Sequence, residues 1–283
     1  MNKVPKICGF YRMYRRGETT LAGTCAFMPA FRRGFSLVEL MTVVSVIALL
    51  MSITMPTVNM VKSQAIKVVC QAKLKTWGPA FASYAAANEG RFPPGLLNYE
   101  FDDNAQRQSL WIGALGNTNS EAMRCPATSK INTSDAVKGV WAYKKGVTTG
   151  LIKGDYGSYC MNGWADSIVP QINGMSHPFL GYYWQKADAV KSAVKVPLLL
   201  DGAYIFGLPK QYDKPPVLSG VFDGKSDMQR FCVPRHGGAV NSLFMDSSVR
   251  SVGVKELWNL KWNRNYDPAF PRPRWYPWMA AYK

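Results

Sequence analysis

The sequence lacks several patterns that would assign it to a common class of protein. No block of lysine and arginine of the kind that binds nucleic acid occurs after residue 34, although the 283 residues carry a formal net charge of +16. No C-x-x-C spacing occurs among the six cysteines, so zinc and redox sites are only weakly indicated and no cofactor is expected. Intrinsic disorder is a poor overall description, because charged residues make up 18% and hydrophobic residues 47% of the chain.

The positive charge is concentrated at the N-terminus. Residues 1–34 hold seven basic residues and a single acid, Glu18, whereas the rest of the chain mixes both signs. Basic residues before an apolar run orient a chain in a membrane, which explains this excess without a nucleic-acid partner. We therefore expect a basic leader at 1–34, a moderately basic remainder and no nucleic-acid partner.

One long apolar run follows this leader, from residue 35 to residue 55. As a helix rising about 1.5 Å per residue it would extend roughly 32 Å, close to the thickness of a bilayer core. The positive-inside rule leaves the N-terminus in the cytoplasm and sends the rest of the chain across the membrane. No A-x-A cleavage site follows the run, and Pro56 stands there instead, which argues against an ordinary secretory signal peptide.

An acidic residue, Glu39, lies near the start of this apolar run. A carboxylate there is costly in lipid, so a functional role is the first hypothesis. The surrounding string, RRGFSLVEL at 32–40, resembles the processing motif of type IV prepilins and pseudopilins, with Arg32 and Arg33 as its basic residues.

The resemblance implies a specific processing event and an assembly role. A prepilin peptidase would cleave after Gly34, and the new terminus, Phe35, would be N-methylated. Glu39 would then pair with the α-amine of a neighbouring subunit, so that two costly buried charges offset each other only in the filament. A proline at the position of Pro56 is common in this family. The leader is long for the family, and Met28 offers an alternative start.

The segment after the membrane run is expected to continue as helix. Residues 57–92 form the amphipathic half of this spine, with a stripe that includes Val58, Val61 and Leu74. Gly78-Pro79 predicts a kink or restart, and residues 88–90 predict the helix end. The resemblance implies an α+β, pilin-like fold, in which the long N-terminal helix packs on an antiparallel β-sheet in a head at 93–257.

Several features of the head resemble a pseudopilin-like family with a C-terminal His-x9-Asp-Gly signature. His236 and Asp246 have this spacing, although Ser247 stands where the glycine is usual, so the signature is degenerate. Strands at 239–245 and 249–254 predict a hairpin. A hydrogen bond between His236 and Asp246 at its base is favoured over a catalytic or metal role, because no nucleophile or partner is supplied by the spacing. No metal site is predicted, and Asp201 is the one weak candidate for a cation ligand.

Four cysteines remain after the leader: Cys70, Cys125, Cys160 and Cys232. In an exported domain this number favours disulfides, and Cys125–Cys160 is the preferred pair. The alternative is that all four are small buried hydrophobic residues.

The C-terminal tail, 258–283, differs from the rest in being rich in proline, aromatic and basic residues. Packing over the head or against another subunit is favoured for it. The alternative is a surface that binds polysaccharide, nucleic acid or a partner.

These features predict a structural subunit without enzyme activity in a type II secretion or type IV pilus-like filament. The expected partners are the prepilin peptidase, an inner-membrane assembly platform and other pseudopilins. The expected location is the bacterial inner membrane, single-pass, with a periplasmic or extracellular head. One alternative is a minor subunit whose head recognises a secreted substrate or a surface glycan. Another is a membrane-anchored periplasmic hydrolase that uses His236 with Asp246 or Asp201.

Overall fold

The computed structural model describes the head and the spine helix in most of their length. The described residues are 9–12, 21–24, 35–93, 111–115, 121–128, 130–131, 139–142, 156–167, 171–172, 175–176, 179–221 and 223–282. Arg32, Arg33 and Gly34 lie outside them. The chain divides into two compact units, Met1–Thr57 and Val58–Lys283.

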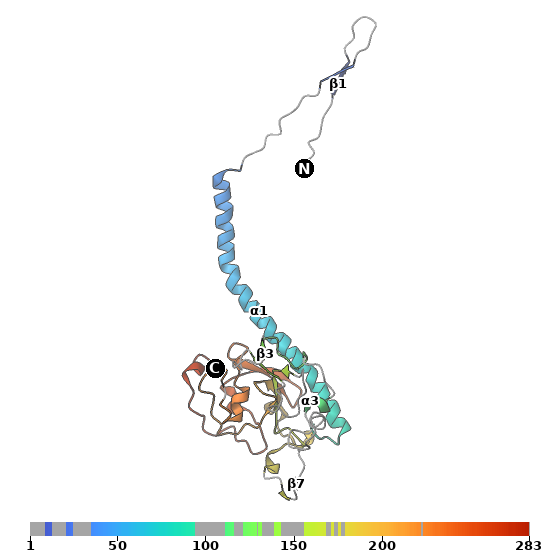
Figure 1. The fold of residues 1–283 in the computed structure, drawn as a ribbon, viewed down its shortest axis with the longest axis vertical. Coiled ribbons are helices and arrows are strands. Elements are labelled where there is room, and N and C mark those ends of the chain that lie inside the picture. The colour runs from blue at the N-terminus through green and yellow to red at the C-terminus, as the bar shows by residue number, and fades with distance from the viewer. Residues whose placement is uncertain are drawn as a thin grey trace. The chain divides into compact units, whose positions relative to one another are not determined.

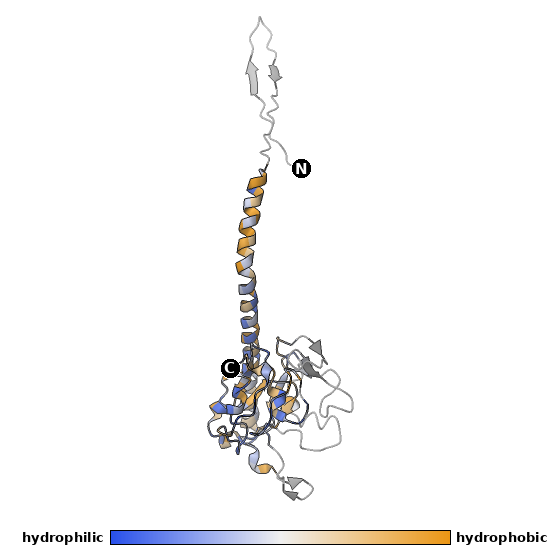
Figure 2. Ribbon diagram, turned by 90° about the vertical axis from the view of Figure 1, so that its left-hand side faces the viewer, coloured by the Kyte–Doolittle hydropathy of each residue, from blue (hydrophilic) through white to orange (hydrophobic). Residues whose placement is uncertain are grey.

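The N-terminal unit contains a short hairpin and the front of a long helix. Strands β1 (Gly9–Arg12) and β2 (Leu21–Thr24) pair antiparallel. Helix α1 (Leu37–Ala87) begins after Ser36, whose backbone N–H donates to Glu39 Oε2 at 3.2 Å. Ser at the cap with Glu three residues later is the capping-box pattern, which satisfies an orphan donor at a helix start. Figure 2 shows the front of α1 as strongly hydrophobic.

Helix α1 runs without interruption through Gly78-Pro79, where a kink or restart was expected. A Cβ built on Gly78 would lie 3.4 Å from Ser247 Cβ and 3.6 Å from a methyl carbon of Leu243, so glycine permits close approach to the sheet. The helix ends where predicted: Glu89 and Gly90 have φ of 55° and 75°, and Gly90 N–H donates back to the carbonyl of Ala85 at 2.8 Å.

The head is built on a five-stranded sheet with the order β10-β6-β9-β11-β12. Figure 1 shows the head beside the rear of α1. The strands are β6 (Tyr159–Asn162), β9 (Pro197–Asp201), β10 (Phe206–Gly207), β11 (Ala239–Phe244) and β12 (Val249–Gly253). The pairs β6–β9, β9–β11 and β11–β12 are antiparallel, whereas β10 runs parallel to β6. The α+β prediction is confirmed, with a sheet that is mixed because of this one parallel edge. The predicted hairpin is β11–β12.

Shorter elements complete the described part of the head. They are α3 (Trp111–Ala114), β3 (Lys130–Ile131), β4 (Gly139–Ala142), β5 (Tyr156–Gly157), β7 (Gln171–Ile172), β8 (Met175–Ser176) and the 3-10 turns η1 (Leu180–Tyr182), η2 (Ala187–Ala189), η3 (Ala193–Lys195), η4 (Asp227–Phe231), η5 (Glu256–Asn259) and η6 (Pro277–Met279). β3, β4 and β5 form a second small sheet, and β7 pairs with β8.

The rear of α1 supplies one wall of the head's core. Its buried residues recur at helical spacing: Cys70, Leu74, Trp77, Gly78, Phe81 and Ala85. Polar contacts fix the register on the sheet, since Gln71 donates to Asn241 Oδ1 at 3.3 Å and Lys75 donates to the carbonyl of Ser247 at 2.7 Å. The predicted stripe was therefore right at Leu74. It was wrong at Val58 and Val61, which are exposed, because complete burial of helix side chains begins only at Cys70.

The C-terminal tail packs over the head, as the favoured interpretation expected. Trp258, Trp262, Tyr266 and Met279 are buried. Asn162, at the end of β6, donates to the carbonyls of Pro197 and Trp262, both at 2.9 Å, which ties the tail to the sheet.

Candidate functional site

The N-terminal segment carries the first candidate site. Phe35 is 73% exposed, and Glu39 is exposed in the first turn of α1. The large apolar side chains that follow are also exposed from Leu37 to Val61. Among the described residues, α1 alone is long and apolar enough to cross a bilayer. An apolar surface of this length needs lipid or neighbouring protein to cover it.

A second candidate site lies inside the head, around His236. Its Nε2 lies 3.1 Å from Asp201 Oδ2, and both side chains are buried. The predicted bond between His236 and Asp246 was wrong: Asp246 Oδ1 instead accepts from the backbone N–H and hydroxyl of Ser248, at 3.0 and 2.6 Å. Ser247, with φ of 62°, turns the chain there, so Asp246 serves its own hairpin turn.

The cysteines have other neighbours than the predicted disulfide would give them. All four described cysteines are buried free thiols, so the predicted Cys125–Cys160 disulfide was wrong. Cys125 Sγ lies 3.3 Å from His236 Nε2. Cys160 packs elsewhere, against the backbone of Gly202, where even an added Cβ would collide with it. The alternative of buried hydrophobic thiols describes Cys160 and Cys232, but not Cys125.

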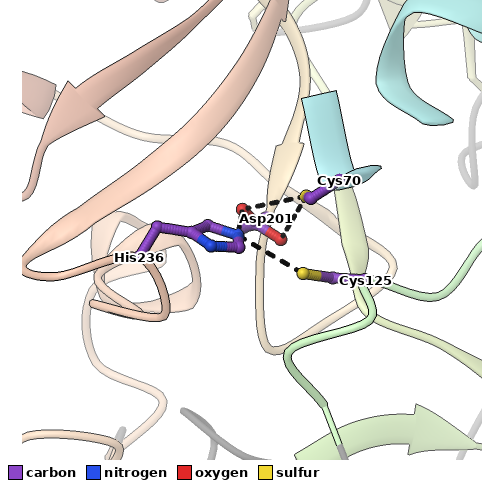
Figure 3. Close-up of side chains that lie close together, drawn as sticks. All are labelled: Cys70, Cys125, Asp201 and His236. Atoms are coloured by element: carbon purple, nitrogen blue, oxygen red, sulfur yellow. Dashed lines mark hydrogen bonds and ion pairs between the residues drawn. The ribbon is translucent and has the colours of Figure 1, made fainter. Parts of the chain in front are cut away.

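Cys70, from the rear of α1, completes the cluster. Its thiol donates to the two carboxylate oxygens of Asp201 at 3.6 and 3.7 Å. One donor atom from each of Cys70, Cys125, Asp201 and His236 lies within 4.8 Å of every other. Figure 3 shows the four side chains pointing toward one common point. We call these four residues the Cys-Asp-His cluster.

Electrostatics in the cluster favour a charged carboxylate and imidazole. Burial opposes charge on Asp201, but the hydrogen bond and charge of His236 outweigh it, so the pKa of Asp201 is lowered. Burial likewise opposes the imidazolium, but the bond to Asp201 raises the pKa of His236 to about 9. Near neutral pH the pair is therefore ionised.

The two thiols respond in opposite directions. Burial raises the pKa of Cys70, but hydrogen bonds from Cys125 and His236 outweigh it and lower this pKa to about 7. The pKa of Cys125 is raised, first by its hydrogen bond to Cys70 and then by burial. The Cys70 thiol therefore ionises more readily than the Cys125 thiol.

Residues around the cluster hold its members in place. Asn241 N–H donates to Asp201 Oδ2 at 2.9 Å, and Arg235 Nη1 lies 3.6 Å from Asp201 Oδ1. Arg235 is anchored by donating to the carbonyls of Ser158 and Gly202, at 2.8 and 3.0 Å. Ser158 Oγ in turn accepts from Cys125 N–H at 2.7 Å.

Sequence reasoning missed most of this arrangement. It paired His236 with Asp201 only in the hydrolase alternative, and it did not join Cys70, Cys125 or Arg235 to them. Cys70 and Asp201 are 131 residues apart, and Cys125 and His236 are 111 residues apart, so no local spacing reveals the cluster. The weak signal was that Asp201 ends a buried strand and His236 precedes another.

A groove of about 950 Å³ lies on the head beside the tail. Aromatic and basic side chains line it, including Tyr212, Lys214, Arg274, Trp275 and Tyr276. Tyr212 is 63% exposed. None of the four cluster residues lines this groove or the smaller one beside Trp164.

The comparisons with known proteins concern the N-terminal segment. A family model described as the prokaryotic N-terminal methylation motif matches residues 30–55. No curated protein and no solved structure matches the chain. The matched residues contain the candidate cleavage site and the whole apolar run, which forms the front of the long helix α1. This combination fits a single-pass membrane anchor and implies processing by a prepilin peptidase. The N-terminal segment of the chain is therefore similar to that of prepilins, with the methylation motif at 30–55, and it precedes an α+β head.

Proposed function

We propose that the chain is a structural subunit of a type II secretion or type IV pilus-like filament. The observation that carries this proposal is the methylation motif at 30–55, together with a helix whose front apolar side chains, from Leu37 to Val61, are exposed. In the membrane, lipid covers them. In a filament, the same surface packs against the helices of neighbouring subunits, which removes it from water.

Processing precedes assembly in this proposal. The prepilin peptidase cleaves after Gly34 on the cytoplasmic side and leaves Phe35 as the N-methylated terminus. Arg32 and Arg33 keep the leader in the cytoplasm. The head lies in the periplasm or outside the cell, and an inner-membrane platform extracts the subunit into the filament with other pseudopilins.

Glu39 gives the filament its register. Within one chain its carboxylate accepts only the N–H of Ser36 among the described groups, so it retains capacity for a second partner. That partner is the α-amine of Phe35 in a neighbouring subunit. Burying either charge alone is costly, so only the register that pairs them is stable.

The test combines N-terminal sequencing with filament co-purification. We expect a mature terminus at Phe35, and we expect Glu39→Gln and Glu39→Ala both to leave filaments while remaining in the membrane. Glu39→Gln is the sharper variant, because glutamine still serves the capping box and removes only the charge. If Glu39→Gln co-purifies with filaments as well as the wild type does, charge pairing is wrong. A different mature terminus would overturn the processing assignment itself.

A second candidate function is recognition of a surface glycan or secreted substrate by the head. The groove beside the tail favours it, because exposed aromatic rings flanked by basic groups suit stacking on sugars and cation–π contacts. Tyr212→Ala is the appropriate variant, because removing part of the tail instead would also remove the buried Tyr266 and Met279. Loss of glycan binding with filament incorporation intact would support this function, and unchanged binding would count against it.

A further inference from the structure

The donor atoms of the Cys-Asp-His cluster converge in a way that a catalytic relay does not. In a relay, a nucleophile contacts one ring nitrogen of histidine and a carboxylate contacts the other. Here Cys125 Sγ and Asp201 Oδ2 both approach His236 Nε2, at 3.3 and 3.1 Å. His236 is only 7% exposed and the other three residues are fully buried, so a substrate has no access.

We propose that Cys70, Cys125, Asp201 and His236 bind one zinc ion within the head. Two thiolates, an imidazole and a carboxylate form a donor set that suits zinc, whereas calcium and magnesium prefer all-oxygen ligands. Four protein ligands without an open position are typical of a structural zinc site.

The distances between the donor atoms fit a tetrahedral zinc site. With Zn–S of about 2.3 Å and Zn–N and Zn–O of about 2.1 Å, the donor atoms of a tetrahedral site lie about 3.4 to 3.8 Å apart. The observed separations are 3.3 Å from Cys125 Sγ to His236 Nε2, 3.1 Å from His236 Nε2 to Asp201 Oδ2, and 3.6 Å from Cys70 Sγ to Asp201 Oδ1. A small outward movement of each side chain would admit the ion.

The charges balance as well. When zinc binds, each thiol releases its proton to solvent as its sulfur–zinc bond forms, and the imidazolium of His236 also releases a proton so that it binds as the neutral imidazole. Two thiolates and one carboxylate exceed the charge of Zn²⁺ by one negative unit. The guanidinium of Arg235, buried 3.6 Å from Asp201 Oδ1, neutralises that unit. This buried cation reduces the cost of burying a site with a net negative charge.

The ion would join parts of the head that are remote in sequence. Cys70 comes from the rear of α1, Cys125 from the turn after α3, Asp201 from the end of β9, and His236 from the turn before β11. Zinc would therefore attach the spine helix to the central sheet. Because such a site exists only in the folded chain, its binding free energy adds to folding. This role is independent of the proposed filament.

The decisive experiment uses the full-length chain, purified in detergent under reducing conditions, stripped with a chelator and then titrated with Zn²⁺ or Co²⁺. We expect one equivalent of zinc per chain. We also expect Co²⁺ to give the intense visible bands of tetrahedral coordination, with thiolate charge-transfer bands of two-sulfur strength, and zinc to displace it.

The variants Cys70→Ala and Cys125→Ala should each weaken zinc binding by at least on the order of 100-fold, since loss of a ligand exceeds the usual cost of losing an outer-shell partner. Cys232→Ala is the matched control, because it removes a buried thiol outside the cluster and should leave zinc affinity unchanged.

Three results would overturn the proposal. They are a wild-type chain that gives no tetrahedral cobalt spectrum, Cys70→Ala and Cys125→Ala variants that keep wild-type affinity, and a metal-free Cys70–Cys125 disulfide as the form isolated without reductant. If the alanine variants do not fold, the cobalt spectrum of the wild-type chain still decides, because it reports geometry and sulfur count without any substitution.

Discussion

The two halves of α1 belong to one helix, but their apolar side chains lie in opposite environments. In the front half, apolar side chains such as Leu50 are exposed, at 55% for that residue. In the rear half, side chains such as Leu74 are fully buried against the sheet. The front half therefore needs lipid or other subunits to bury its apolar side chains, whereas the head of the same chain buries those of the rear half. Hydrophobicity alone does not distinguish these roles, since what matters is which surface covers the side chain.

The largest expected effect concerns the polar attachment of the rear half. Asp201→Ala leaves His236 and Arg235 buried without their carboxylate, which should cost about 3–5 kcal/mol of head stability. Urea unfolding followed by tryptophan fluorescence measures it. Asp246→Ala is the control: this residue is exposed and its hydrogen bonds go to Ser248 in its own turn, so its loss should cost less than about 1 kcal/mol. An equal loss of stability in both variants would favour the original prediction that Asp246 bonds His236 at the base of the hairpin.

A matched pair of leucines tests the comparison directly. Leu74→Ala should destabilise the head by about 2–5 kcal/mol, because it removes buried methyl groups and leaves a cavity. Leu50→Ala, the same change in the same helix, should leave head unfolding in detergent within about 0.5 kcal/mol. A clear loss of head stability from Leu50→Ala would show that the halves are not energetically separate.

Metal removal tests how much the proposed zinc site stabilises the attachment of the rear half of α1 to the sheet. At a free zinc concentration 100 times the dissociation constant, chelation should remove about 2.7 kcal/mol of stability. For a head of this size the melting temperature should fall by roughly 5 to 10 °C. Differential scanning fluorimetry with and without chelator measures the shift. The Cys70→Ala variant should not respond to the chelator, and an equal shift in that variant would point to an unspecific effect.

The smallest expected effect is at the contact between helix and sheet. Gly78→Ala adds a Cβ about 3.4 Å from Ser247, an ordinary contact, and it replaces glycine inside a helix. The head should gain about 0.5–1 kcal/mol, because alanine loses less backbone entropy than glycine on folding. Thermal unfolding of the variant checks this. A destabilised variant would mean that the helix and the β11–β12 turn approach too closely for any side chain.

Local patterns in the chain predicted much of the fold. The end of α1 at residues 88–90 followed from a left-handed glycine and the prolines after it, which are properties of neighbouring residues. The β11–β12 hairpin followed from alternation and a turn between two strands. The disulfide, the His236–Asp246 bond and a restart of the helix at Gly78-Pro79 were predicted wrongly, because each depended on what the rest of the head places beside those residues.

The sequence by itself determined the prepilin-like N-terminus: a basic leader, a cleavage motif, Glu39 and one apolar run of bilayer length. These signals are contiguous, so their chemistry can be read without a fold. Only the tertiary structure decided which polar residues meet in the head. Cys70, Cys125, Asp201 and His236 come from four separate segments, and their meeting depends on strand order and on the packing of α1 against the sheet. No local sequence pattern indicates this long-range placement, because each of the four residues looks like an ordinary buried residue among its sequence neighbours.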